Sequence, residues 1–154
     1  MKVARGLMAL GTACLAQILL SRYLPSLGHR CDLFSILVVY YGLTRHQTPA
    51  MLMGSGAGLV QDSLVGSLLG LNGFKKTLIG YLVGSVGSLF MLNQAIPRFG
   101  ILFGATFLDP LTELMISLAL GRSFVFPALS DLVQLALGNG LVGLLIFWIA
   151  ARIR

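Results

Sequence analysis

The chain has 154 residues, of which 56% are apolar and only 10% are charged, and its mean hydropathy is +0.90. A soluble domain carries about 25% charged residues, so this chain has too little charge to cover a surface that faces water. The same numbers exclude an intrinsically disordered protein, which combines low hydrophobicity with high charge. The composition therefore predicts an integral membrane protein whose apolar exterior faces lipid.

Six apolar segments follow one another along the chain: residues 6–21, 33–44, 46–61, 77–97, 99–121 and 132–151. A helix that spans a bilayer needs about 20 predominantly apolar residues. The fourth and sixth segments have this length, and the first reaches it if Arg5 and Arg22 extend to the two interfaces. The sequence predicts an all-α, polytopic membrane bundle of six transmembrane helices, with five as the alternative, in one domain over residues 1–154.

The segment 33–44 is short for a membrane span. Its 12 residues cover only about 18 Å as a helix, so it either recruits flanking residues or packs inside the bundle. Asp32 at its start suits a helix N-terminus, where the helix dipole favours a carboxylate. After this segment, we predict that Thr48 is the N-cap and Pro49 the first residue of the next helix.

The basic residues bear on topology and on partners. Lys2 and Arg5 before an apolar stretch resemble a signal peptide, but no small-x-small cleavage site follows at 21–25, so we interpret this segment as a retained span. The terminal basic clusters favour a cytoplasmic location for both ends. The net charge of +6 does not indicate a nucleic-acid protein, because the basic residues are scattered near segment ends. We interpret them, Lys75 and Lys76 included, as interfacial anchors.

The sequence contains no recognisable cofactor or catalytic motif. Cys14 and Cys31 form no CxxC pair, and His29 and His46 lie in separate connections, so no metal or redox site is expected. The G-x-G-x-x-G string at 138–143 lies in an apolar segment rather than after a strand, so we assign its glycines to helix packing. The same interpretation applies to the glycine pairs at four-residue spacing: Gly54/Gly58, Gly66/Gly70, Gly80/Gly84 and Gly100/Gly104. We expect a protein that is not an enzyme.

Asp109 and Glu113 lie four residues apart within the apolar segment 99–121, on one helix face, with Pro110 between them. A charge at mid-membrane costs about 2.5 to 3.5 kcal/mol on insertion scales, so both carboxyls need a partner, a proton or a wet cavity. One interpretation is a proton or cation relay, or a contact to a partner's transmembrane helix. The other is a proline-kinked helix whose carboxyls hydrogen-bond Asn139, Gln134 or nearby hydroxyls.

The most distinctive stretch is residues 58–73, in which Asp62, Gly66 and Gly70 recur at four-residue spacing. A continuous helix would present a smooth glycine face that begins at a carboxylate. The glycines equally allow a broken or re-entrant segment. Such a break is tolerated at membrane depth only where protein or water satisfies the backbone.

This stretch resembles the rod shape-determining protein MreD family. The family pattern G-L-x-x-D-x-x-x-G-x-x-L-G-x-N matches at every position from Gly58 to Asn72, and the pattern R-x-D-L matches at 30–33, with Cys31 where the family usually has proline. The length of this chain and the order of its apolar segments agree with the family over essentially the whole chain. One departure is the connection between the fourth and fifth helices, usually rich in arginine, which holds only Arg98.

The resemblance implies a non-enzymatic scaffold of the bacterial cell-elongation complex, located in the inner membrane and without a cofactor. It would regulate cell shape and peptidoglycan synthesis by binding MreC, with MreB, RodA and a class B penicillin-binding protein in the wider complex; a homodimer is a further hypothesis. We expect Asp32 and Asp62 to be helix-end or interior polar anchors. The other residues singled out are Gly66, Gly70 and Asn72, which would shape the turn, and Glu113, an interior polar group of open role.

The family also resembles in fold the six-helix substrate-binding (S) components of energy-coupling-factor vitamin transporters. The alternative function is therefore a membrane component that binds a vitamin-type small molecule between its helices. Against it, Trp148 is the only tryptophan and the outer connections hold no polar or aromatic cluster. A proton-coupled carrier is a third hypothesis, for which the sequence shows no inverted repeat.

Overall fold

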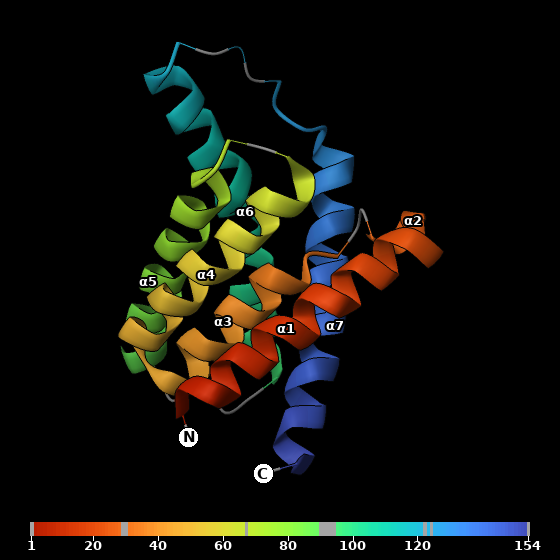
Figure 1. The fold of residues 1–154 in the computed structure, drawn as a ribbon, viewed down its shortest axis with the longest axis vertical. Helices are drawn as coiled ribbons and strands as arrows, with labels where there is room; N and C mark the ends of the chain where they lie inside the picture. Colours follow the sequence, from red (N-terminus) through yellow and green to blue (C-terminus); the bar gives the residue numbers. More distant parts are fainter. Residues whose placement is uncertain are drawn as a thin grey trace.

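The computed structural model describes residues 2–28, 31–66, 68–89, 95–121, 123 and 125–153, and in these it is all-helical. Its elements are α1 (Lys2–Tyr23), α2 (Pro25–Gly28), α3 (Leu33–Arg45), α4 (Gln47–Val65), α5 (Leu71–Leu89), α6 (Ala95–Ala119) and α7 (Leu129–Ile153) (Figure 1). The six helices other than the single turn α2 correspond to the six predicted segments, so the predicted all-α membrane bundle is confirmed. The single turn α2 was not predicted.

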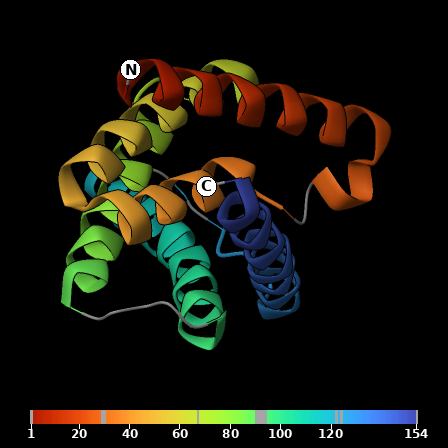
Figure 2. The ribbon, with the colours of Figure 1, turned by 90° about the horizontal axis from the view of Figure 1, so that it is seen from below.

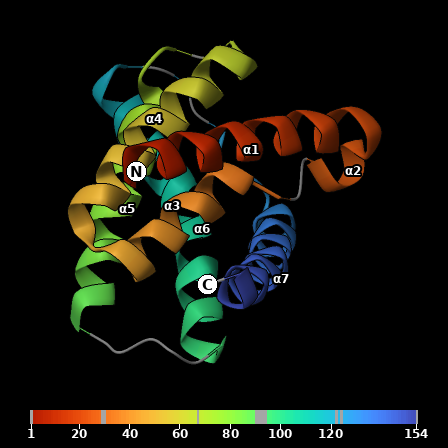
Figure 3. The ribbon, with the colours of Figure 1, turned by 60° about the horizontal axis from the view of Figure 1, so that its bottom comes forward.

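The helices form an inner group and a periphery. α3, α4 and α5 pack against one another, α6 packs against α5 and α7, and α1 lies across α3 and α4 (Figures 1 and 3). Seen from below, α1 runs along one side of the bundle, and its end with α2 extends beyond the other helices (Figure 2). None of the residues Ala4–Tyr23 is buried. The outer helix α1 is therefore available for contacts within the membrane.

Three helices, α1, α6 and α7, are long and apolar enough to cross a membrane by length and composition. The shorter apolar helix α3 occupies the centre of the bundle. Its Phe34, Ile36, Val38 and Val39 are completely buried and pack against side chains of the other helices. The 13-residue α3 therefore packs inside the bundle, one of the two arrangements expected for this short segment.

Glycines bring α4 and α5 into close contact. A Cβ on Gly58 would lie 2.3 Å from the carbonyl carbon of Asn72, and one on Gly80 would lie 2.6 Å from the carbonyl oxygen of Ala50. The pairs Gly54/Gly58 and Gly80/Gly84 thus pack within the chain, as predicted. By contrast, a Cβ on Gly100 or Gly104 of α6 would meet no other part of the described chain within 4 Å.

Three predicted helix boundaries are wrong. α5 begins at Leu71, not at 77, and ends at Leu89, so that Pro97 belongs to α6. The prediction started the helix after the last charged residue, whereas Lys75 and Lys76 lie inside the bundle and are paired there. Thr48 is not an N-cap, because α4 begins at Gln47 and His46, with φ 82°, occupies the junction between α3 and α4.

Candidate functional site

The turn between α4 and α5 is built around the Asp62 carboxylate, which is 1% exposed. Its oxygens accept hydrogen bonds from the backbone N–H groups of Gly70 (2.7 Å) and Asn72 (3.1 Å) and from Asn72 Nδ2 (2.9 Å). The N–H groups at the start of a helix have no partner within the helix, and they favour a negative charge nearby. Asp62 therefore caps α5 from the preceding helix.

Gly66 ends α4. Its φ of 67° is left-handed, and its N–H donates to the Asp62 carbonyl oxygen. Glycine adopts this conformation without the steric cost of a Cβ. Gly70, with φ 98°, continues the turn into α5. Of the two interpretations of residues 58–73, the continuous helix with a glycine face is therefore wrong, and the broken segment is observed.

A second carboxylate, the partly buried Asp32, caps α3 and binds a lysine. Its Oδ1 accepts from the N–H groups of Phe34 (3.0 Å) and Ser35 (3.2 Å). Its Oδ2 accepts from Ser35 Oγ (2.9 Å) and from Lys76 Nζ (2.6 Å). Lys76 is completely buried, and its Nζ also donates to Ser35 Oγ at 2.7 Å. The ammonium group on α5 thereby fixes the start of α3.

Two amide side chains satisfy the backbone around Asp32. Asn139 on α7 accepts from the Asp32 N–H at 2.7 Å and donates to Thr106 Oγ1 on α6 at 3.1 Å. Gln17 on α1 accepts from the Leu33 N–H at 3.1 Å. A buried backbone group without a partner is costly, so these contacts stabilise the chain before α3. We call the group of Gln17, Asp32, Ser35, Lys76, Thr106 and Asn139 the polar network; it joins α1, α3, α5, α6 and α7.

Lys75 carries a separate ion-pair cluster between α5 and α6. Its Nζ lies 2.9 Å from Glu113 Oε2 and 3.7 Å from Asp109 Oδ1. The structure thus supports a paired state for both carboxyls, but the predicted partners of these carboxyls are wrong, since Asn139 bonds to Asp32 and Thr106 instead. A cation satisfies a carboxylate in low dielectric better than an amide does.

The interpretation of Lys75 and Lys76 as interfacial anchors is also wrong, because their exposed fractions are 4% and 0%. One signal in the sequence pointed to them. All five carboxylates lie in or next to apolar segments and need counter-charges, and the only adjacent pair of Lys or Arg residues is Lys75–Lys76. Gln17, Ser35 and Thr106, which complete the polar network, left no comparable signal.

The remaining predicted residues are placed as follows. Asp62, Gly70 and Asn72 come together at the α4–α5 turn, whereas Asp32 and Glu113 belong to the two ion-pair clusters; Arg30 lies outside the described residues. Cys31 is buried, and burial together with the adjacent Asp32 carboxylate raises the pKa of its thiol. The described residues contain no group of three or more side chains that could hold a metal ion.

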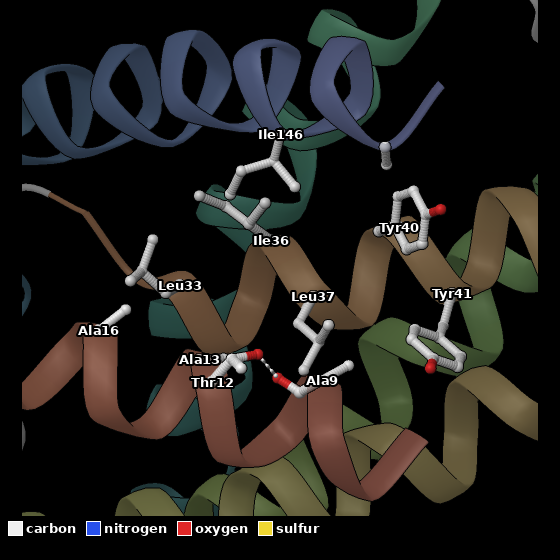
Figure 4. A pocket seen from close by; sticks show the side chains of 11 residues that line it. Ala9, Thr12, Ala13, Ala16, Leu33, Ile36, Leu37, Tyr40, Tyr41 and Ile146 are labelled. Carbon is white, nitrogen blue, oxygen red and sulfur yellow. Dashed lines mark hydrogen bonds between the residues drawn. The ribbon is translucent and has the colours of Figure 1, made fainter. Parts of the chain in front are cut away.

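An apolar groove lies on the outside of this framework, between α1, α3 and α7. Its cavity has a volume of about 380 Å³. Small side chains of α1 form one wall, and larger apolar side chains of α3 and α7 face them (Figure 4). The Thr12 hydroxyl donates to the Ala9 carbonyl of its own helix at 2.9 Å, so it offers no free donor to the groove. We call this cavity the α1–α7 groove; its lining includes Ala9, Ala13, Ala16, Ile36, Leu37, Tyr40, Ile146 and Ala150.

Fold and interior together define a small helical membrane protein in which two lysines pair with carboxylates inside the bundle and apolar side chains are exposed on its outside. The family model described as rod shape-determining protein MreD matches residues 6–153. Because the match covers nearly the whole chain, this chain belongs to the MreD family, and it is a rod shape-determining membrane protein. No curated protein and no solved structure gives a significant match.

Proposed function

We propose that this chain is a non-enzymatic scaffold of the cell-elongation complex in the bacterial inner membrane. In this proposal it regulates cell shape and peptidoglycan synthesis by binding the single-span protein MreC. MreB, RodA and a class B penicillin-binding protein belong to the wider complex. The observation that carries the proposal is the α1–α7 groove, which is apolar and is walled by small side chains.

The groove has the properties of a site for a transmembrane helix. In lipid, helices associate through close van der Waals packing, and small residues permit the backbones to approach. Ala9, Ala13 and Ala16 lie on one face of α1 at spacings of four and three residues, and they line the groove together. We therefore assign the groove to the transmembrane helix of MreC, with α1 as the main contact.

The interior supports a scaffold role in a second way. The polar network ties α1, α3, α5, α6 and α7 together at one level of the bundle, through Lys76, Asn139 and Gln17. A framework held by buried, hydrogen-bonded charges keeps its shape when a partner binds. The two walls of the groove, α1 and α7, both hydrogen-bond to the start of α3, so they hold a constant separation for an incoming helix.

The test replaces a groove residue with a bulky one. Ala13→Trp fills the groove, whereas Ala4→Trp serves as the matched control, because Ala4 lies nine residues away on the opposite face of α1 and is exposed. Both tagged variants are expressed in the native bacterium, and the proteins recovered with each are identified after membrane levels have been matched.

We expect Ala13→Trp to lose MreC and rod shape, while Ala4→Trp retains both. Full recovery of MreC with Ala13→Trp would overturn the assignment to the groove. Recovery of ATPase subunits in place of wall-synthesis proteins from the unmodified chain would contradict the scaffold itself and would support the transporter alternative.

A further inference from the structure

A second cavity lies between the last turns of α1 and α4, apart from the α1–α7 groove, with a volume of about 540 Å³. α1 contributes Ile18, Ser21 and Arg22, and α4 contributes Gln61, Leu64 and Val65. Unlike the α1–α7 groove, it combines a cation, a hydroxyl, an amide and exposed apolar side chains.

Arg22 supplies the positive charge of this cavity. It is exposed, and it makes no ion pair with another described residue. A guanidinium group donates two parallel hydrogen bonds to phosphate oxygens. The hydroxyl of Ser21, on the same turn, adds a donor. This end of α1 therefore offers a phosphate its charge partner.

Gln61 supplies an acceptor. Its Oε1 is buried and has no hydrogen-bond partner among the described residues. A buried polar atom without a partner costs free energy, which a donor from a ligand would recover. The terminal amide of glutamine turns about a broad torsion, so its oxygen can meet a ligand hydroxyl at the cavity wall. The side chains of this cavity thus match a ligand that carries a hydroxyl group next to a phosphate.

The apolar part of the cavity continues into the lipid-facing surface. Ile18, Leu64 and Val65 are 41%, 47% and 69% exposed. The candidate span of α1 ends at Tyr23, one residue after Arg22, and tyrosine favours the level of the lipid headgroups. The cavity therefore lies where a headgroup meets its acyl chains.

We propose that this cavity binds an anionic phospholipid of the phosphatidylglycerol type. Arg22 and Ser21 hold the phosphate, and Gln61 accepts a hydrogen bond from a headgroup hydroxyl. The acyl chains lie along Ile18, Leu64 and Val65. This site is separate from the α1–α7 groove, so it does not depend on the function proposed above.

The test measures bound lipid by native mass spectrometry on the purified full chain in detergent, titrated with phosphatidylglycerol or phosphatidylcholine. Arg22→Gln is expected to weaken phosphatidylglycerol binding about tenfold, as expected for the loss of one charge-assisted contact. Arg5→Gln, the same substitution at the other end of α1, leaves binding unchanged. Gln61→Leu weakens phosphatidylglycerol binding and leaves phosphatidylcholine binding as it was.

Three results would overturn the proposal. Equal losses in Arg22→Gln and Arg5→Gln would mean general attraction to the surface, and equal binding of the two lipids would mean no headgroup recognition. Displacement of the lipid by an excess of inorganic phosphate would mean a site for a free anion. Unfolding temperatures of all variants are compared first, and the exposed position of Arg22 predicts that Arg22→Gln folds.

Discussion

Lys76 Nζ lies 2.6 Å from Asp32 Oδ2, and this contact joins α5 to the N-cap of α3. The two oxygens of Asp32 have different tasks, since Oδ1 accepts the backbone N–H groups of α3 and Oδ2 accepts the ammonium group. The same side chain therefore starts a helix and neutralises a buried charge. The hydrogen bonds of Asp32 to α3 and its ion pair with Lys76 on α5 together hold the short helix α3 at the centre of the bundle.

Removal of the lysine should be strongly destabilising. Lys76→Met leaves the partly buried Asp32 carboxylate without its counter-charge, and the loss of one partner from a buried pair costs about 3 to 5 kcal/mol. Adding Asp32→Asn to Lys76→Met should restore part of this stability, because asparagine still caps a helix and carries no charge. Unfolding of the purified protein in detergent, followed by circular dichroism, measures both. A double variant less stable than Lys76→Met alone would contradict the assigned pairing.

Substitution of Asp62 should disrupt the start of α5. Asp62→Ala leaves the N–H groups of Gly70 and Asn72 without an acceptor, and we expect a loss of about 2 kcal/mol or more. Asp62→Asn keeps one acceptor oxygen and should lose less. In cells, Asp62→Ala should reduce membrane levels of the protein or its association with MreC. Normal rod growth with complete recovery of the complex would contradict this prediction.

Gly58 and Gly56 offer a matched pair on one helix. A Cβ at Gly58 would lie 2.3 Å from the backbone of Asn72, whereas one at Gly56 would meet no atom within 4 Å. We expect Gly58→Ala to destabilise the protein by about 1 to 3 kcal/mol through overpacking. Gly56→Ala should be neutral or stabilising by up to about 1 kcal/mol, because alanine is the better helix former. Equal unfolding midpoints for the two variants would exclude the tight α4–α5 contact.

Substitutions of Lys75 and of Glu113 in the ion-pair cluster should destabilise the protein to different extents. Lys75→Met leaves Asp109 and Glu113 without their cation, and we expect a loss of about 3 kcal/mol, the lower end for a broken buried pair. The side chain of Glu113 is 36% exposed, so Glu113→Gln should cost less than about 1 kcal/mol. Unfolding curves of the two variants under the same conditions test this order. A larger loss in Glu113→Gln would place the main partner of Glu113 elsewhere.

The fold was predictable to the level of helices and their order. Apolar segments with few charges located all helices except the single turn α2, and the glycine spacing predicted the contacts of Gly54, Gly58, Gly80 and Gly84. The start of α5 was mispredicted because a charged residue was taken to mark the end of an apolar span. A lysine inside a bundle violates this rule whenever a carboxylate from another helix neutralises it, and that partner is distant in the sequence.

The candidate site was predictable only in part. The acidic residues stood out because carboxylates are rare in apolar segments, and the resemblance to the MreD family depended on Asp32, Asp62 and their neighbours. Their partners did not stand out, because Gln17, Ser35 and Thr106 are ordinary residues in a helix. The α1–α7 groove could not be predicted from the sequence either, because the alanines of α1 form one wall of a groove only when α7 packs opposite them.

Composition by itself determined that this protein resides in a membrane, because a chain with 10% charge cannot cover a surface in water. The lengths of the apolar segments determined that it is helical. The glycine spacing left a continuous helix and a broken segment equally open for residues 58–73, and the tertiary structure decided that α4 ends at Gly66. Only the tertiary structure decided which cation pairs with which carboxylate, since Asp32 and Lys76 are 44 residues apart. Electrostatic pairing in low dielectric depends on distance in space, and that distance is set when α3, α5, α6 and α7 pack together.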